Sequence, residues 1–382
     1  MSTITFELPR ALQAGAALPV NLLDQELDTP ALLVDLDVVD GNIARMQDFA
    51  TSEGFLLRPH AKSHKSIAIA ERQLQAGASG LCVATSSEAE ALGATSAHDI
   101  LVAYPLVGQR KLDRVANLAL EGRLSLVTDS LVVTEAYGAF ARRHGMTIPV
   151  LVEVDTGMNR AGVGPSKVVA IALDVARTDG LHFAGIMTHA GHAHDAATAD
   201  DIVQVARTEA IMMGDVRVEL ERAGLDVPIV SAGSTITSPF LRASDGITEI
   251  RPGTYVYNDL RTLGRFACTP EDIAPSMLTT IVSINGTRLT VDAGNKTLTS
   301  SRDAVYGYGR LADRDDVTVA RMSEEHGLLA APLPDHGYQV GDRVRVLPIH
   351  VCVWMDLQRE VYGTRGGRVV ETISVDGMRH SL

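Results

Sequence analysis

Short apolar runs alternate with longer amphipathic stretches between about residue 30 and residue 258. The runs are rich in β-branched residues, and the stretches repeat apolar positions at helical spacing, notably at residues 38–50, 86–92, 111–121, 133–144, 166–177 and 200–223. Strict alternation of strands and helices predicts a parallel sheet, and the number of units favours a closed (β/α)8 TIM-type barrel. The expected strands are residues 31–35, 55–58, 80–84, 100–104, 124–128, 150–154, 183–188, 229–232 and 250–257. That is one strand too many for an eight-stranded barrel, so one assignment is wrong.

The pattern changes after about residue 260. Short alternating runs, punctuated by glycine, asparagine and aspartate, lie at residues 278–284, 288–292, 317–322, 343–346 and 369–373. Such runs are typical of antiparallel β structure. A chain of 382 residues also exceeds the size at which one hydrophobic core usually stops growing. The sequence therefore predicts a barrel followed by a C-terminal antiparallel β-domain.

Composition and charge exclude several classes of function. Hydrophobic residues make up 46% of the chain, charged residues 21%, and no apolar run approaches the ~18 residues of a membrane span. No secretory signal is visible, and three scattered cysteines (Cys82, Cys268, Cys352) form no disulfide framework, so we expect a cytoplasmic protein without a membrane partner. A net charge of −13 disfavours nucleic acid as a partner. The basic cluster around Lys62 would still attract a small anionic substrate.

Lys62 is the first candidate for chemistry. Residues 56–65 form an apolar strand that stops at Pro59 and then presents Lys62 among other basic residues. An amine beside other cations loses its proton more readily, and a strand end fixes its position, so Lys62 could bind an aldehyde as a Schiff base. A solvated basic turn is the alternative that this segment leaves open.

Residues 29–37 and 56–65 resemble the pyridoxal-phosphate enzymes of the alanine racemase fold, and among them the D-threonine aldolase and D-serine dehydratase family. Further segments match this family in the same order: residues 155–162, 188–192, 231–235, 251–255, 325–327 and 350–352. The resemblance implies a barrel over residues 28–260 that binds pyridoxal 5'-phosphate. It also implies a β-domain with a metal site, formed by residues 1–27 and 261–382, and a homodimer.

Two segments of small residues are candidates for binding the cofactor phosphate. Bare backbone amides and hydroxyls at strand ends can surround a phosphate, although isolated glycines are usually turns. The family places the phosphate at these segments, which are Gly233, Ser234 and Thr235 after one expected strand and Gly253, Thr254 and Tyr255 within the next.

The resemblance assigns three further residues to the cofactor. Arg160 matches an arginine beside the phenolic oxygen, where a fixed positive charge favours the oxyanion; from the residues alone it could be a surface cation. His189 matches the position whose ring stacks on the cofactor face. Arg251 corresponds to the arginine that faces the pyridine nitrogen in the racemases. If it does so here, the ring stays unprotonated and is a weaker electron sink.

Residues 188–194 carry three histidines at an expected strand end. A lone histidine is usually structural, but three invite separate roles. We expect His192 and His194 to be candidates for acid or base at the substrate hydroxyl. Dehydratases of the family have a tyrosine where His194 stands, whereas the aldolases place a histidine within one residue of it.

His350 and Cys352 are the candidate metal ligands. On a strand, residues i and i+2 point to one face, where imidazole and thiolate suit zinc and leave positions open for water or substrate. Core packing of a buried cysteine is the alternative. In the family this position is the divalent metal site, His-x-Cys in dehydratases and His-x-Asp in aldolases. Cys352 therefore favours zinc, with manganese or magnesium as alternatives, and the dehydratase branch.

The sequence thus predicts a lyase that uses pyridoxal phosphate and a divalent metal and acts on a small β-hydroxy-D-amino acid. Cys352 favours β-elimination to a keto acid and ammonia, as in D-serine dehydratase. The alternative is cleavage to glycine and an aldehyde, as in D-threonine aldolase. A racemase shares the barrel and the lysine but has no use for His350 and Cys352. A non-catalytic carrier of pyridoxal phosphate would lack the residues after 260.

Overall fold

The structure is a computed structural model that describes residues 27–331 and 336–378. The chain divides into two compact units. One, the barrel domain, comprises Ile43–Tyr255 with Arg265–Ala267. The other, the β-domain, comprises the described residues up to Asn42 and those of Val256–Gly264 and Cys268–Met378. Among the described residues, no helix has the length and apolar character that crossing a membrane requires.

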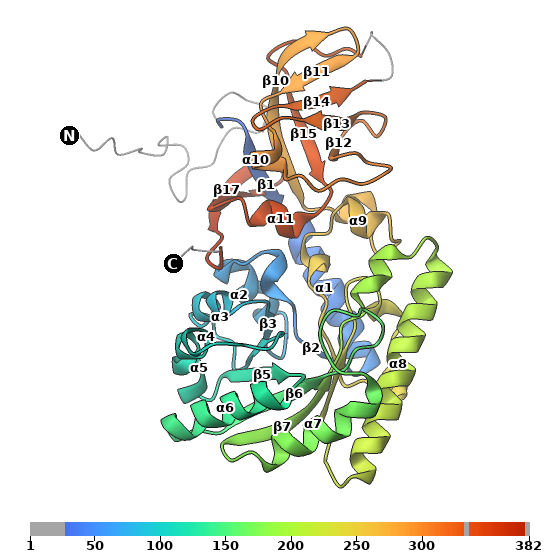
Figure 1. Ribbon diagram of the computed structural model, residues 1–382. Helices are drawn as coiled ribbons and strands as arrows, with labels where there is room; N and C mark the ends of the chain where they lie inside the picture. The colour runs from blue at the N-terminus through green and yellow to red at the C-terminus, as the bar shows by residue number, and fades with distance from the viewer. Residues whose placement is uncertain (1–26, 332–335, 379–382) are drawn as a thin grey trace, which may run out of the picture. The chain divides into compact units, whose positions relative to one another are not determined.

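Eight parallel strands form the sheet of the barrel domain (Figure 1). In spatial order they are β2 (Leu56–Leu57), β9 (Glu249–Ile250), β8 (Ile229–Ala232), β7 (Leu181–Met187), β6 (Ile148–Glu153), β5 (Leu124–Thr128), β4 (Ile100–Val102) and β3 (Leu81–Val83). The Ser79 N–H donates to the Leu57 carbonyl and the Cys82 N–H to the Pro59 carbonyl, both at 2.8 Å. These bonds join the β2 segment to the β3 segment and close the sheet, so the predicted barrel is confirmed.

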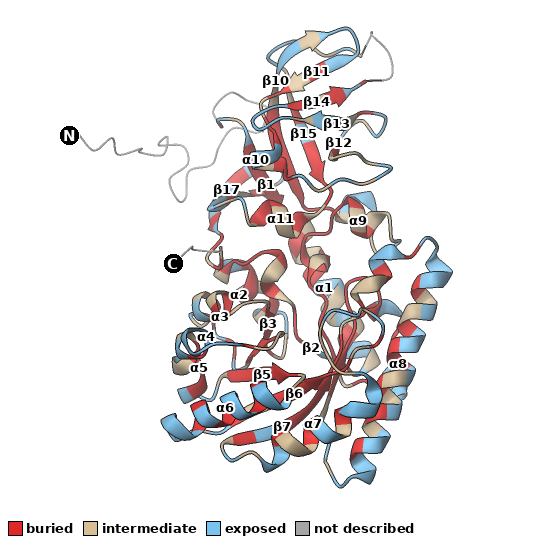
Figure 2. Ribbon diagram, in the orientation of Figure 1, coloured by how far each residue is buried: buried red, intermediate tan, exposed pale blue. Residues whose placement is uncertain are grey.

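Helices alternate with these strands and bury one face against them (Figure 2). They are α1 (Leu36–Glu53), α2 (Ile67–Gln75), α3 (Ser86–Leu92), α4 (Gln109–Arg114), α5 (Ala116–Leu120), α6 (Leu131–His144), α7 (Pro165–Arg177) and α8 (Ala199–Arg222). A capping box begins α8, because the Thr198 hydroxyl accepts the Asp201 N–H at 3.2 Å and the Asp201 carboxylate accepts the Thr198 N–H at 3.0 Å.

Side chains from alternate strand positions fill the barrel interior. They form one cluster of Cys82, Leu101, Val127, Leu151, Ala184 and Met187. The neighbouring positions on the same strands point outward and join a second cluster with the helices. Cys82 is fully buried in the inner cluster, where it acts as a packing residue.

Nine strands make up the sheet of the β-domain. Six of them close on themselves, because β11 pairs with both β14 and β10: β10 (Pro275–Asn285), β15 (Arg343–Pro348), β12 (Gly309–Leu311), β13 (Thr318–Met322), β14 (Gly327–Ala330) and β11 (Arg288–Val291). The other three extend the sheet beyond β10: β1 (Ala31–Asp35), β16 (Glu360–Arg365) and β17 (Arg368–Ser374). Short helices α9 (Leu260–Leu263), α10 (Asn295–Leu298) and α11 (Val351–Met355) complete the domain.

Residues 31–35 are the strand that was one too many for the barrel. They form β1, which pairs antiparallel with β10 and parallel with β16 in the β-domain. The run is almost wholly buried, as a barrel strand would be, so its local pattern does not reveal which sheet it joins. The last expected strand is also shorter than predicted, since β9 ends at Ile250 and Thr254–Val256 form a 3-10 turn after Pro252 and Gly253.

Most expected β-domain strands lie within β10, β11, β13, β15 and β17, whereas β12, β14 and β16 were not predicted. Two of the missed strands are short, and β16 contains Gly363, so none offers a long β-branched run. The predicted association of residues 1–27 with this domain falls mainly outside the described residues. Leu27, which is described, packs in a cluster with Ala31 and Leu278.

Candidate active site

Lys62 lies on the turn that follows β2. Residues Ala61–Ser63 form a single 3-10 turn, and the ring Nδ1 of His60 accepts the Lys62 N–H at 3.5 Å. Lys65, three residues on, is buried and forms an ion pair with Glu88 at an N–O distance of 3.4 Å. Lys65 is therefore a buried structural residue. Lys62 is the lysine that lies at the carboxyl end of the strand.

Positive charges from three strand ends converge around His60. Burial lowers the pKa of His60 well below its usual range, and the charges of Lys62, Arg251 and Arg160 lower it further. Burial and the same three cations also depress the pKa of His189. Both imidazoles are therefore neutral near pH 7, and the region would attract an anion. The structure thus brings Lys62 and Arg160 within electrostatic reach of His60 and His189.

Two glycines shape the segments predicted to hold the phosphate. Gly233 follows β8 with a φ of +78°, and a Cβ there would lie 2.5 Å from the Ser238 hydroxyl oxygen. A Cβ on Gly253 would lie 2.9 Å from the His60 carbonyl oxygen and 3.0 Å from the Ser63 hydroxyl oxygen. Larger residues at either position would push these segments apart. Gly253 in particular lets the segment after β9 approach the turn that carries Lys62.

Only some backbone amides of these segments are left for a phosphate. The Gly233 N–H donates to Glu209 Oε1 and the Ser234 N–H to a Thr237 hydroxyl, both at 3.0 Å. Among the described residues, the N–H groups of Thr235 and Gly253 have no acceptor. The side chain of Thr235 ties the two segments together instead, because its hydroxyl accepts the N–H of Tyr255 at 3.0 Å.

Tyr255 contributes its backbone to this region rather than its phenol. Its side chain is buried, and its hydroxyl accepts a hydrogen bond from Gln73 Nε2 at 2.9 Å. Burial raises the pKa of the phenol, so it stays protonated. Thr254 begins the 3-10 turn Thr254–Val256 that carries Tyr255 away from the strand end.

The three histidines after β7 occupy different environments. The ring of His189 is close enough to Gly191 that a Cβ there would lie 3.0 Å from His189 Nε2. His192 lies on the 3-10 segment Gly191–Asp195. Its ring lies close to Gly157, because a Cβ on that glycine would be 3.3 Å from the nearest ring atoms. His194 is exposed, and its charge reaches His189.

Arg160 is presented by a tight loop after β6. Asp155 Oδ1 accepts the N–H of Gly157 at 3.0 Å and that of Asn159 at 3.1 Å, which folds the loop back on itself. The Arg160 side chain is exposed, yet its charge reaches the buried Glu153. Burial raises the pKa of Glu153, and Arg160 partly offsets that rise.

Arg251, in contrast, is buried and held on two sides. One guanidinium nitrogen donates to the Ser231 hydroxyl and another to the Thr188 carbonyl. Its charge lies close enough to His60 and His189 to lower both of their pKa values. The side chain is thus fixed at the ends of β7 and β8, next to the predicted cofactor site.

The prediction that His350 and Cys352 share one face of a strand is wrong. β15 ends at Pro348, His350 has extended φ and ψ and caps α11, and Cys352 is the second residue of that helix. The chain turns here because Asp259 Oδ2 accepts the Val351 N–H at 3.0 Å, an interaction between distant segments that local spacing does not reveal. A guanidinium nitrogen of Arg261 lies 3.2 Å from His350 Nδ1.

The donor atoms of this pair nevertheless suit a metal. Imidazole and thiolate are the ligands that zinc prefers, and two protein ligands leave positions open. In the part of the chain that the structure describes, no group of three or more histidine, cysteine, aspartate or glutamate side chains is arranged to hold a metal ion.

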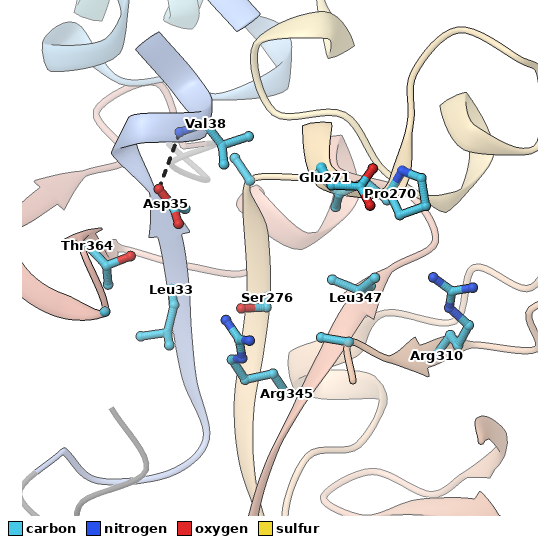
Figure 3. A pocket seen from close by; sticks show the side chains of 14 residues that line it. Leu33, Asp35, Val38, Pro270, Glu271, Ser276, Arg310, Arg345, Leu347 and Thr364 are labelled. Atoms are coloured by element: carbon cyan, nitrogen blue, oxygen red, sulfur yellow. Dashed lines mark hydrogen bonds between the residues drawn. The ribbon is translucent and has the colours of Figure 1, made fainter. Parts of the chain in front are cut away.

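The β-domain also contains a cavity of about 440 Å³, lined by residues of β1, β10, β12 and β15 (Figure 3). Arg345 lies beside Ser276 in this cavity, and Arg310 lies nearer Pro270. Neither His350 nor Cys352 lines it. The cavity is therefore distinct from the predicted metal pair.

Comparison with known proteins decides the family. The alanine racemase N-terminal domain model matches residues 34–260, and a serine dehydratase domain model matches residues 274–364. The chain is 35% identical to the D-threo-3-hydroxyaspartate dehydratase of Delftia sp., over 85% of this chain and 91% of that enzyme. The chain belongs to the D-threonine aldolase and D-serine dehydratase family. The family predicted from the sequence is therefore confirmed, and the protein is an enzyme of the alanine racemase-like group.

Other members of the family extend this likeness. The D-threonine aldolase of Arthrobacter sp. is 30% identical, over 91% of each chain. A solved D-threo-3-hydroxyaspartate dehydratase variant in its metal-free form has a TM-score of 0.85 and 32% identity, covering 91% of this chain and 97% of that one. The alanine racemase of Clostridium difficile shares the fold, with a TM-score of 0.66 at 15% identity.

The residues present fit the cofactor that this family implies. Pyridoxal phosphate carries negative charge on its phosphate and phenolic oxygen, and Lys62, Arg160 and Arg251 supply positive charge around one site. Gly233 and Gly253 form a cradle that a Cβ would fill. The cofactor prediction therefore agrees with the chemistry of the barrel domain.

Sequence reasoning missed two buried carboxylates near the site. Glu209 lies on the buried face of α8 and Glu249 lies inside β9. The available signal was their place in the pattern, since Glu209 occupies an apolar position of an amphipathic helix and Glu249 an apolar strand. A carboxylate at such a position is seldom buried without a partner.

Proposed function

We propose that this enzyme is a lyase for β-hydroxy-D-amino acids that uses pyridoxal phosphate and a divalent metal, and that it carries out β-elimination to a keto acid and ammonia. The observation that carries the elimination branch is Cys352, a thiol where the family's aldolases have a carboxylate. The higher identity to D-threo-3-hydroxyaspartate dehydratase, 35% against 30% for D-threonine aldolase, agrees with it.

The barrel domain would hold the cofactor through residues that follow β2, β6, β7, β8 and β9. Pyridoxal phosphate supplies, when bound, a conjugated ring that withdraws electrons from the substrate α-carbon. The Lys62 amine would attach to its aldehyde, and the N–H groups of Thr235 and Gly253 would bind its phosphate. Arg160 would lie at the phenolic oxygen and His189 against the ring face.

Elimination needs one proton acceptor and one departing hydroxide. Once the substrate amine has displaced it from the aldehyde, Lys62 Nζ would take the α-proton, so that the Cα–H electrons form a Cα–Cβ double bond while the Cβ–O bond breaks. A divalent metal on His350 and Cys352 would supply Lewis acidity to the leaving hydroxyl. The unsaturated amine that is released then hydrolyses to a keto acid and ammonia.

Retro-aldol cleavage is the second candidate, and the histidine segment favours it. The exposed ring of His194, or that of His192, would take the β-hydroxyl proton while the Cα–Cβ bond breaks to release an aldehyde. A proton delivered to Cα would then complete glycine. This route needs a base at the hydroxyl, whereas elimination needs that hydroxyl to leave. Both routes would use Lys62 and a metal on His350 and Cys352.

Product analysis separates these outcomes. The purified enzyme, loaded with pyridoxal phosphate and zinc, should be incubated separately with D-serine, D-threonine and D-threo-3-hydroxyaspartate, with the L-enantiomers as controls. Ammonia and a keto acid in equal amounts support elimination, and glycine with an aldehyde would establish the aldolase instead. Interconversion of enantiomers without either product pair would show a racemase.

The metal and the assembly are tested separately. We propose zinc as the bound metal, and elemental analysis of the protein purified without chelators should find it, whereas manganese or magnesium alone would contradict this choice. We also propose a homodimer, which light scattering in solution would distinguish from a monomer.

A further inference from the structure

A hydrogen-bonded chain of side chains with alternating charges crosses the interior of the barrel domain, from Asp99 through Arg58, Glu249 and Ser231 to Arg251. An Asp99 carboxylate oxygen lies 2.8 Å from a guanidinium nitrogen of Arg58, and Arg58 Nε donates to Glu249 Oε2 at 2.8 Å. Arg58 and Glu249 are 5% and 0% exposed, whereas the Asp99 side chain is 30% exposed. One end of the chain therefore meets solvent and the rest is buried.

The other end of this chain reaches the candidate active site. Glu249 Oε1 accepts the Ser231 hydroxyl at 2.5 Å, and the Ser231 oxygen in turn accepts a hydrogen bond from Arg251. The direction is fixed, because a carboxylate only accepts and a guanidinium only donates. Ser231 is fully buried and Arg251 is 4% exposed.

The arrangement does more than neutralise charge. A second guanidinium nitrogen of Arg251 donates to the Thr188 carbonyl, so that two anchors fix the plane of the group. An ion pair of Arg58 with Glu249 alone would satisfy the charges of those two side chains. The link through Ser231 is the part that reaches Arg251, beside Lys62, His60 and His189.

We propose that Glu249 and Ser231 are positioning residues for Arg251, and that the chain from Asp99 sets the electrostatic potential at Lys62. The inference rests on the cofactor site of the proposed function but not on the choice between elimination and cleavage. Neither residue touches the substrate. They act by holding one cation in place and by balancing its charge.

The sign of the effect follows from charge. Glu249→Gln keeps the shape of the side chain but removes a negative charge. The anion that lies between Arg58 and Arg251 is then lost. The potential at Lys62 becomes more positive, so any group there that gains a proton to become cationic does so at lower pH. Ser231→Ala keeps every charge and removes only the bridge, so it should move Arg251 with a smaller electrostatic effect.

The experiment uses the protein loaded with pyridoxal phosphate and two kinds of readout. The visible absorption of the bound cofactor is titrated with pH, and crystal structures of the variants locate Arg251. For Glu249→Gln we expect the titration midpoint to fall by about half a unit or more, as for the loss of one nearby charge. Asp99→Asn should lower the titration midpoint by a smaller amount. The protein should tolerate this substitution better, because Asp99 is partly exposed.

Tyr137→Phe is the matched control for lost stability. Its buried hydroxyl accepts the Leu106 N–H at 2.7 Å and donates to the Val127 carbonyl at 3.0 Å, in the same barrel but outside this chain. We expect it to destabilise the protein without moving the midpoint. Unmoved midpoints in Glu249→Gln and Asp99→Asn, or Arg251 in its original place in Ser231→Ala crystals, would overturn the proposal. If the protein bound no cofactor, the proposed function would fail, and the position of Arg251 in cofactor-free crystals would still decide this inference.

Discussion

Glu209 offers a direct test of how the candidate site is held together. Its Oε1 accepts the Gly233 N–H at 3.0 Å from the buried face of α8. Burial raises the pKa of this carboxyl, and the Gly233 amide, the Thr237 hydroxyl and the Ala190 amide partly offset that rise. One buried carboxylate therefore holds the segment after β8 against α8.

Two substitutions separate the acceptor from the charge. Glu209→Gln and Glu209→Ala both remove the charge, but only glutamine can still accept the Gly233 N–H. An unsatisfied buried amide costs ~1–3 kcal/mol, and the cavity left by truncation adds about 1 kcal/mol. We expect the alanine variant to be less stable than the glutamine variant by about 2–4 kcal/mol. It should also bind pyridoxal phosphate about tenfold more weakly or worse, since 1.4 kcal/mol is about tenfold in affinity.

The effect of the Glu209 charge is measured by comparing the stability of the wild type with that of Glu209→Gln across pH. A raised pKa means that the folded protein binds this proton more tightly than the unfolded chain, whose pKa is near 4.5. The wild type therefore loses stability as pH rises from that value through the folded pKa. Glu209→Gln should be more stable than the wild type at neutral pH, and the difference should vanish in acid.

The assay must report on the right domain. Trp354 is the only tryptophan and lies in the β-domain, so its fluorescence does not follow the barrel. Urea unfolding of the cofactor-free protein should be followed by the helical circular dichroism signal, because α2 to α8 lie in the barrel domain. Equal stability of the glutamine and alanine variants at every pH would refute the reasoning about the Gly233 amide.

Three further results are expected. Lys62→Ala should lose the visible absorption near ~420 nm that borohydride bleaches in the wild type, since a conjugated imine is the expected adduct; Lys65→Met is a control that should keep it if it folds, and a reducible chromophore in Lys62→Ala would exclude this role. Chelation, or His350→Ala with Cys352→Ala, should abolish turnover while the visible spectrum persists, and full activity after verified metal removal would count against a metal role. His194→Phe should slow an aldolase by about 10²–10⁴-fold but a dehydratase much less; in an enzyme that releases glycine, an unchanged rate would assign the base elsewhere.

The barrel was predictable because its signal is local and repeated. Alternation of β-branched runs with amphipathic stretches appears in every unit, and parallel strands leave their functional side chains at one edge. Lys62, Arg160 and His189 follow expected strands and so fall at that edge, although the resemblance was needed to assign Arg160 and His189 to the cofactor. The strand at residues 31–35 was misassigned because its partners are defined by pairing with distant segments, which a local apolar run does not encode.

The supporting residues were harder to predict, because their roles depend on three-dimensional neighbours. Gly233 was expected to offer its amide to a phosphate, yet the distant Glu209 already accepts it. His350 and Cys352 were expected on a strand, yet the carboxylate of Asp259 caps a helix there. Sequence spacing identifies residues that share an element, whereas buried hydrogen bonds between elements become visible only in the fold.

The pairing of β1 has a consequence for synthesis of the chain. Leu33 is aligned with Ser276 on one side and with Tyr362 on the other, so the ribosome makes this strand long before either partner exists. The barrel segment Ile43–Tyr255 is synthesised after β1 and before its partners, and it can fold as a unit while both edges of β1 are still unpaired. An apolar strand with open edges invites pairing with other chains. Chains that end before β16 would keep one such edge permanently, so nascent and truncated forms of this enzyme are the ones most exposed to aggregation.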